Sequence, residues 1–192
     1  ADGASARYTR ILDAGCELFY ERGFAAVTVN EIGERAGVHG PNVYRHFRSK
    51  DVILATLFED AIDRLVASTS RTCEDPREEL ELLVRGHIGF VLADRRLAGV
   101  MLREERSLAP ADKQRVRRRE ARYAARWVDC LQRCFPNREP DALRTAALTT
   151  VGALNSIASW PRDAATRAQL GEEVVTVTLD GLGSLATRSI KD

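Results

Sequence analysis

Apolar residues recur at helical spacing along almost the whole chain. Between residues 8 and 22, for example, Ile11, Leu12, Cys16, Leu18 and Phe19 lie on one stripe of a helix. The same spacing, interrupted at glycines and prolines, predicts about nine helices. They cover residues 8–22, 28–35, 42–47, 50–70, 77–93, 95–107, 111–135, 141–160 and 167–187. The β-branched residues 174–178 are ambiguous, and we assign them to a helix because their neighbours keep helical spacing. The predicted fold class is all-α.

Local signals place the ends of the first helices. Gly23 and Gly37 stand where glycine commonly ends a helix. Thr28 and Glu31 have the spacing of a capping box, in which each side chain bonds to the other residue's backbone. Ser49 suits the start of the next helix. These signals predict a three-helix N-terminal domain over residues 1–50 and a larger helical domain over residues 51–192.

The second and third predicted helices are short and are joined by a turn that contains Gly37 and Gly40. Two short helices joined by a glycine-containing turn form a helix-turn-helix, whose second helix enters the major groove of DNA. The pattern therefore predicts DNA binding by residues 28–47.

The charge distribution agrees with this prediction. The 192 residues carry a net charge of +1, which excludes a chain-wide basic coat, and residues 51–192 are balanced. Residues 35–50 contain no acid. Their polar groups include Arg35, Arg45, Arg48, Lys50, His39, His46 and the Tyr44 hydroxyl. A local cluster of cations is what phosphate binding requires. The alternative is a solvated face on which Tyr44 and His46 only pack.

The N-terminal motifs resemble the DNA-binding domain of the TetR family of repressors. The motifs, in order, are RILDAGCELF at 10–19, GF at 23–24, TVNEI at 28–32, AGV at 36–38, VYRHF at 43–47 and SKD at 49–51. The resemblance covers residues 7–58. The rest of the chain agrees with the family only in length and number of helices.

This resemblance implies a role for each residue of the DNA-binding surface. Thr28, Tyr44, His46 and Lys50 would contact the phosphate backbone. The base edges would be faced by His39, Gly40, Pro41, Asn42 and Arg45. Residues 40–42 depart from the usual family pattern and offer few long side chains, which leaves the operator sequence open.

The resemblance also implies a small-molecule pocket and a homodimer surface in the C-terminal domain. The candidate pocket residues are Phe58, Ile62, Leu83, His87, Phe90, Met101, Tyr123, Trp127 and Cys130. The candidate dimer residues are Leu148, Val151, Leu154, Ile157, Val174 and Val177. Most of these side chains could instead belong to the protein's own core. The implied function is that of a ligand-responsive repressor, which leaves a palindromic double-stranded operator when an apolar or amphipathic effector binds.

A basic stretch in the seventh predicted helix has two interpretations. Residues 113–126 contain seven basic residues and one acid, Glu120. They could form a cationic rim for an anionic ligand, such as an acyl-coenzyme A or a fatty or steroid acid. They could equally form a solvated face that pairs with acids such as Asp60 and Asp63.

Other classes of protein fit the sequence less well. Neither a zinc-protease motif nor a di-iron motif, phosphate loop or nucleophile elbow occurs, so we expect no enzyme, no metal and no cofactor. Two alternatives remain, a thiol-based redox sensor that uses Cys130 and Cys134, and a helical adaptor that binds only protein. The four cysteines lie far apart or one helical turn apart and form no C-x-x-C pair. Together with the absence of an apolar span and an N-terminus unlike a signal peptide, they predict a cytoplasmic protein without membrane contact.

Overall fold

The computed structural model describes residues 2–186, and within them it confirms the all-α fold class. These residues form ten α-helices and three short 3₁₀-helices, and none of them lies in a β-strand. They divide into two compact units. Unit 1 contains residues up to 62 together with residues 96–117, and unit 2 contains residues 63–95 together with the chain from 118. This grouping differs from the division expected after residue 50, and the domain boundary stays a prediction.

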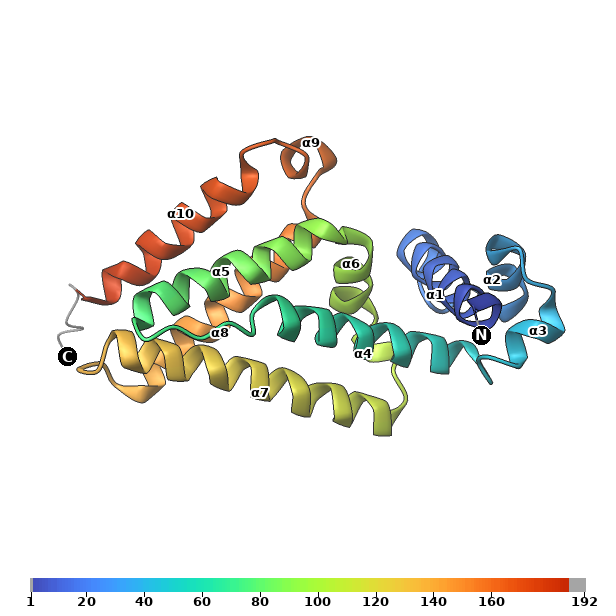
Figure 1. Ribbon diagram of the computed structural model, residues 1–192, viewed down its shortest axis with the longest axis horizontal. Helices are drawn as coiled ribbons and strands as arrows, with labels where there is room; N and C mark the ends of the chain where they lie inside the picture. The colour runs from blue at the N-terminus through green and yellow to red at the C-terminus, as the bar shows by residue number, and fades with distance from the viewer. Residues whose placement is uncertain (1, 187–192) are drawn as a thin grey trace. The chain divides into compact units, whose positions relative to one another are not determined.

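Unit 1 contains the N-terminal helices α1 (Asp2–Arg22), α2 (Val29–Ala36) and α3 (Gly40–Tyr44) (Figure 1). It also holds most of α4 (Lys50–Ser68) and of α6 (Arg95–Glu104), the 3₁₀-helix Glu105–Ser107 and the beginning of α7 (Pro110–Cys134). Helix α2 packs against both α1 and α3. The core of this unit includes the buried side chains Ile11, Phe19, Ile32, Phe47, Ile53 and Phe58.

The turn between α2 and α3 has the predicted glycine conformation. Gly37 caps α2 with φ of +64°, a left-handed conformation in which a side chain would be strained. Helix α3 begins earlier than the expected residue 42 and is shorter. Its last turn continues through the N–H groups of His46 and Phe47, which both bond to the Val43 carbonyl. Phe47 then stacks on the ring of Tyr8, with 4.8 Å between the ring centres, which fixes the end of the helix-turn-helix to α1.

Unit 2 is built around α5 (Pro76–Ala93), which contacts both α8 (Pro140–Ser156) and α10 (Leu170–Gly183). The unit also contains the rest of α7, the 3₁₀-helices Ile157–Ser159 and Ser184–Ala186, and the four-residue helix α9 (Arg162–Ala165). Its core includes Leu83, Val91, Trp127, Leu131, Leu143 and Leu154. No helix of the described residues is long and apolar enough to cross a membrane.

The helix boundaries differ from the sequence prediction in a few places. Helices α5, α7 and α8 each begin at a proline, one residue early, because proline suits the first position of a helix. Helix α1 begins at Asp2 instead of residue 8, and α9 occupies a stretch that was predicted to be a break. Residues 174–178 are helical as predicted. The expected helix end at Thr187 lies outside the described residues.

Candidate functional site

The N-terminus of α2 is held by the predicted capping box. The Thr28 hydroxyl accepts a hydrogen bond from the Glu31 N–H at 3.3 Å, and the Glu31 carboxylate accepts one from the Thr28 N–H at 2.8 Å. The Thr28 hydroxyl also donates to Glu31 at 2.7 Å, and Arg22 pairs with the same carboxylate at 2.7 Å. The bond from the Thr28 hydroxyl, followed by that from Arg22, lowers the pKa of Glu31 to about 2. This network leaves Thr28 exposed at the start of α2.

Helix α3 presents a polar face to solvent. Pro41, Asn42, Tyr44 and Arg45 are all exposed, with 53% of Tyr44 accessible, and His39 is exposed just before the helix begins at Gly40. His46 is half-buried. The opposite side of the helix is buried through Val43 and Phe47. The structure therefore brings the predicted base-reading residues together on one short exposed element.

The predicted basic cluster is smaller than the sequence suggests. Arg35 pairs with Glu17 at 3.2 Å and Glu21 at 3.5 Å, both on α1. The Lys50 ammonium donates to the backbone carbonyls of Phe24, Ala25 and Val27. Arg45 and Arg48 are exposed and make no hydrogen bond or ion pair within the described residues. Two of the four expected cations thus remain free to meet phosphate.

Three of the predicted pocket residues meet in the core of unit 2. His87 Nδ1 lies 2.9 Å from the Tyr123 hydroxyl, and His87 Nε2 lies 2.9 Å from Asn155 Oδ1. The Trp127 ring packs edge-on against both His87 and Tyr123. Burial lowers the pKa of His87 to about 4 and raises that of Tyr123 to about 12, so both are neutral near pH 7. The buried Trp127 Nε1–H makes no well-formed hydrogen bond among the described residues, although its approach to the Tyr123 hydroxyl acts to lower the pKa of Tyr123 against the effect of burial.

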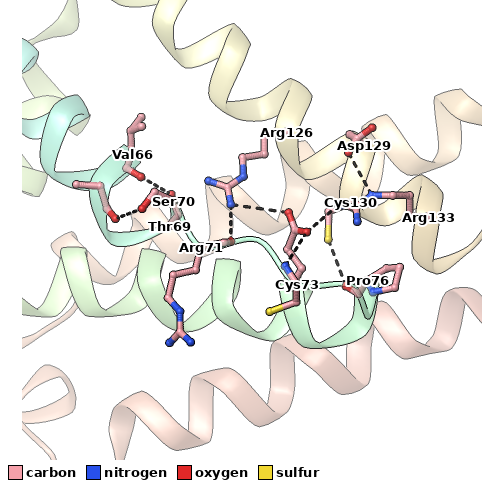
Figure 2. Close-up of polar contacts among 12 residues, drawn as sticks. Val66, Thr69, Ser70, Arg71, Cys73, Pro76, Arg126, Asp129, Cys130 and Arg133 are labelled. Atoms are coloured by element: carbon pink, nitrogen blue, oxygen red, sulfur yellow. Dashed lines mark hydrogen bonds and ion pairs between the residues drawn. The ribbon is translucent and has the colours of Figure 1, made fainter.

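The other predicted pocket residues are divided between the two units. Leu83 and Phe90 are buried on α5. Phe58 and Ile62 are buried, and Met101 half-buried, in unit 1. Cys130 is buried on α7, and its thiol donates to the Pro76 carbonyl at 3.4 Å (Figure 2).

The cysteine environments disfavour the redox-sensing alternative. Burial raises the pKa of Cys130 to about 12 and also raises the pKa of Cys134. Both side chains are free thiols. Since the thiolate is the reactive form, these thiols react slowly with oxidants near neutral pH.

The predicted dimer residues divide into two groups. Leu154 and Ile157 are each 1% exposed and belong to the core of unit 2, so they offer no area to a partner and their assignment is wrong. Leu148 is 50% exposed and Val177 73% exposed, whereas Val151 and Val174 are half-buried. Val177 also lines a shallow hollow with Gln169, Glu172, Glu173 and Thr176.

The basic stretch of α7 is largely paired with acids. Arg115 bonds to Glu59 at 3.0 Å and Arg117 to Glu105 at 2.9 Å, and Arg119 pairs with Asp63. This pairing favours a solvated face over a cationic rim, as expected for exposed charges of both signs.

Several residues of these networks were not predicted from the sequence. Asn155, which bonds to His87, lies on a helix of small residues with no polar pattern to mark it. Glu79 is buried although it stands among other acids in the first turn of α5, where acids are ordinary. Glu104 bonds to the Phe24 N–H from eighty residues further along the chain, and no local signal predicts that contact.

Two family models cover most of the chain. Residues 11–57 match the model described as bacterial regulatory proteins, tetR family. Residues 73–182 match the model described as tetracyclin repressor-like, C-terminal domain.

Individual relatives agree with these models. The chain is 34% identical to the transcriptional activator FasR of Mycolicibacterium smegmatis over 91 residues. These residues make up 46% of this chain and 42% of FasR. FasR and the fatty acid metabolism regulator protein of Bacillus subtilis are thus each matched over less than half of their length.

Solved structures share the fold. The ketosteroid transcriptional regulator KstR2 of Mycobacterium tuberculosis superposes with a TM-score of 0.80 at 21% identity, over 91% of this chain and 94% of that one. AibR, solved in complex with isovaleryl coenzyme A and operator DNA, superposes with a TM-score of 0.77 at 17% identity. The superposition covers 91% of this chain and 97% of AibR. The family models, which together account for both halves of the sequence, show that the chain belongs to the TetR family of bacterial regulatory proteins.

Proposed function

We propose that this protein is a ligand-responsive, DNA-binding regulator of transcription. The observation that carries the proposal is the exposed polar face of α3, which follows a capped α2 through the left-handed turn at Gly37. This is the arrangement by which a helix-turn-helix places its second helix in the major groove. The two exposed and unpaired cations, Arg45 and Arg48, supply local positive charge.

The residues of this surface divide between backbone and base contacts. Thr28 and the first N–H groups of α2 hold one phosphate, because a helix N-terminus attracts anions. Tyr44 and His46 touch the backbone from α3. Arg45 and Asn42 read bases, since Arg pairs with guanine and Asn with adenine through two hydrogen bonds. His39, Gly40 and Pro41 face the base edges beside them.

The protein acts as a homodimer on a pseudo-palindromic operator, because two-fold protein symmetry requires matching half-sites. The partner contacts are made by apolar residues of α8 and α10, which are the exposed Leu148 and Val177 and the half-buried Val151 and Val174. Exposed apolar surface of this kind commonly marks an interface.

The effector binds in unit 2 next to His87, Tyr123 and Trp127. Support comes from AibR, which has the same fold and was solved with both isovaleryl coenzyme A and operator DNA. The polar groups of the cluster are neutral, and the buried Trp127 N–H makes no well-formed hydrogen bond within the described residues, so an effector oxygen would supply a better acceptor. We therefore propose an amphipathic effector with a neutral oxygen acceptor, such as a carbonyl, on an apolar body.

Effector binding releases DNA, so the protein acts as a repressor. The relatives include both kinds of regulator, since FasR is named an activator and KstR2 a repressor. A panel of fatty acids, acyl-coenzyme A thioesters and steroid acids, screened by thermal shift, tests the effector class. Compounds that stabilise the wild-type protein but not Trp127→Phe, and that release operator DNA, support the proposal.

Selection of bound fragments from the source genome tests the DNA-binding function. The selected fragments are expected to share a pseudo-palindrome, and Arg45→Ala is expected to relax preference at one position of each half-site by about 1–3 kcal/mol. A protein-binding adaptor would show no salt-dependent shift of any duplex.

A further inference from the structure

In the connection between α1 and α2, both backbone polar groups of Phe24 are hydrogen-bonded to side chains of other helices. The Phe24 N–H donates to Glu104 Oε1 at 3.2 Å, and the Phe24 carbonyl accepts from Lys50 Nζ at 2.9 Å. Glu104 is the last residue of α6, and Lys50 is the first residue of α4. The backbone of Phe24 is thus tied to the last residue of α6 and to the first residue of α4.

The Lys50 ammonium is fully occupied by this connection. It donates to Phe24 O at 2.9 Å, Val27 O at 3.0 Å and Ala25 O at 3.4 Å, and it lies 4.4 Å from the centre of the Phe24 ring. An ammonium group has three N–H donors, so a phosphate oxygen could bind only by replacing one of these carbonyls.

Arg22 is a second cation that binds a backbone carbonyl of the α1–α2 connection. Arg22 donates to the Ala26 carbonyl at 2.9 Å, so the four consecutive carbonyls of residues 24–27 all accept bonds from Lys50 or Arg22. The same arginine pairs with Glu31 of the capping box. The residue that follows these carbonyls is Thr28, the N-cap of α2. The position of the phosphate-binding end of α2 therefore depends on how residues 24–27 are held.

Helix α6 is bound closely to α1 beside this connection. Gly99 lies so near the Tyr20 ring that an added Cβ would stand 2.7 Å from it. Arg103 donates to the Tyr20 carbonyl at 3.0 Å and lies over its ring, and Arg96 pairs with Glu17 at 2.9 Å. A shift of α6 along α1 would therefore carry Glu104 away from the Phe24 N–H.

We propose that Lys50 is a positioning residue that holds the α1–α2 connection, and not a phosphate contact. With Glu104, it makes the backbone of Phe24 the point through which movement of α4 or α6 reaches the N-terminus of α2. The inference rests on the proposed DNA-binding function. The exposed arginines supply the charge that meets phosphate, while Lys50 and Glu104 set the place of Thr28.

Operator affinity measured across a range of salt concentrations tests the role of Lys50. Lys50→Met removes the donors and the charge, whereas Lys50→Gln keeps neutral N–H donors. We expect Lys50→Met to weaken operator binding by about tenfold and Lys50→Gln to regain part of that loss, with little change in the salt slope of either. The proposal would be overturned if the salt slope of operator affinity fell by about one unit per protomer in both variants and if Lys50→Gln bound no more tightly than Lys50→Met. That result would show that Lys50 contacts a phosphate.

Hydrogen exchange of the peptide that covers residues 23–28 supplies a second readout. Lys50→Met and Glu104→Ala are expected to speed exchange there, while Glu104→Gln, which keeps an acceptor, stays near wild type. Arg48→Met is the control, because it removes an exposed charge two residues from Lys50 without touching the connection. Unchanged exchange in Lys50→Met contradicts the proposal.

A double-mutant cycle separates this proposal from the proposed function. Because both side chains hold the backbone of one residue, the double variant Lys50→Met, Glu104→Ala should lose about as much operator affinity as whichever single variant loses more. Losses that multiply would contradict a shared role. A wild-type protein that binds no specific operator would instead remove the proposed function itself.

Discussion

The guanidinium of Arg133 lies 2.9 Å from the carboxylate of Glu79, whose side chain is only 4% exposed. Arg126 lies 3.8 Å from the other carboxylate oxygen, Oε1, whereas the Cys73 N–H donates at 3.5 Å to Oε2, the oxygen that Arg133 contacts (Figure 2). Burial by itself raises the pKa of Glu79. The bonds from Arg133 and Cys73 and the charges of the two arginines outweigh it, so the pKa is lowered overall. This pair ties the start of α5 to α7 within unit 2.

Glu79→Gln is therefore expected to lower the free energy of unfolding by about 1–3 kcal/mol at pH 7. Because the folded pKa is depressed, the stabilisation is complete above the ordinary pKa of Glu and is lost as the pH falls through the folded value. Urea unfolding at several pH values measures both effects. Glu81→Gln, which breaks an exposed pair with Arg85, is the control and should cost less than about 1 kcal/mol. Equal losses for the two variants would contradict the role of burial.

His87 gives the unfolding free energy a second pH dependence. Its pKa is about 4 in the folded protein and 6.5 ordinarily, so between these values the unfolded chain binds a proton that the folded protein does not. Stability from this group is present above pH 6.5 and falls by about 3 kcal/mol as the pH drops to 4. His87→Gln should flatten this slope, whereas His39→Gln, at an exposed position, should leave it unchanged. A slope that persists in His87→Gln must come from other groups.

Removal of the Thr28 hydroxyl is expected to loosen the start of α2. Thr28→Ala should lower the free energy of unfolding by about 1 kcal/mol and weaken operator binding. The pKa of Glu31 should rise from about 2, because the hydrogen bond from Thr28 is the largest cause of its lowering. An NMR titration of Glu31 measures this change. Thr176→Ala removes a hydroxyl that bonds within α10 and should change neither property. An unshifted Glu31 would refute the cap as the cause.

The dimer surface is tested at its two most exposed apolar residues. Leu148→Arg and Val177→Arg place a charge in the proposed interface, so sedimentation should show monomers at micromolar concentration and operator affinity should fall. A similarly exposed leucine of α6, replaced in Leu102→Arg, is the control and should stay dimeric. An obligate interface would bury on the order of 2,000 Å² or more in total. Wild-type protein that sediments as a monomer would exclude this interface.

Local chemistry made the N-terminal part of the fold predictable. The capping box at Thr28 and Glu31 and the left-handed turn at Gly37 depend on residues within one or two helical turns. Their spacing alone therefore predicts the ends of α2. The exposed face of α3 follows in the same way from its buried residue Val43 and from Phe47, which is buried three residues after the helix ends.

Long-range contacts were not predictable in the same way. Helix α8 carries apolar residues on more than one face, and periodicity cannot tell which of them meets the protein's own core. Leu154 was therefore assigned to the dimer, although the structure buries it. Lys50 has the same sequence neighbours whether it meets phosphate or carbonyls, and its partners lie more than twenty residues earlier. Only tertiary packing decides such cases.

The most direct test of DNA-binding regulation compares two labelled duplexes by fluorescence anisotropy. One is a pseudo-palindrome selected from genomic fragments, and the other has the same composition with scrambled half-sites. At an ionic strength of about 0.15 M, the dimer is predicted to bind the selected duplex at least about a thousandfold more tightly. Equal affinity for the two duplexes would contradict the assignment of the α3 surface to sequence-specific recognition.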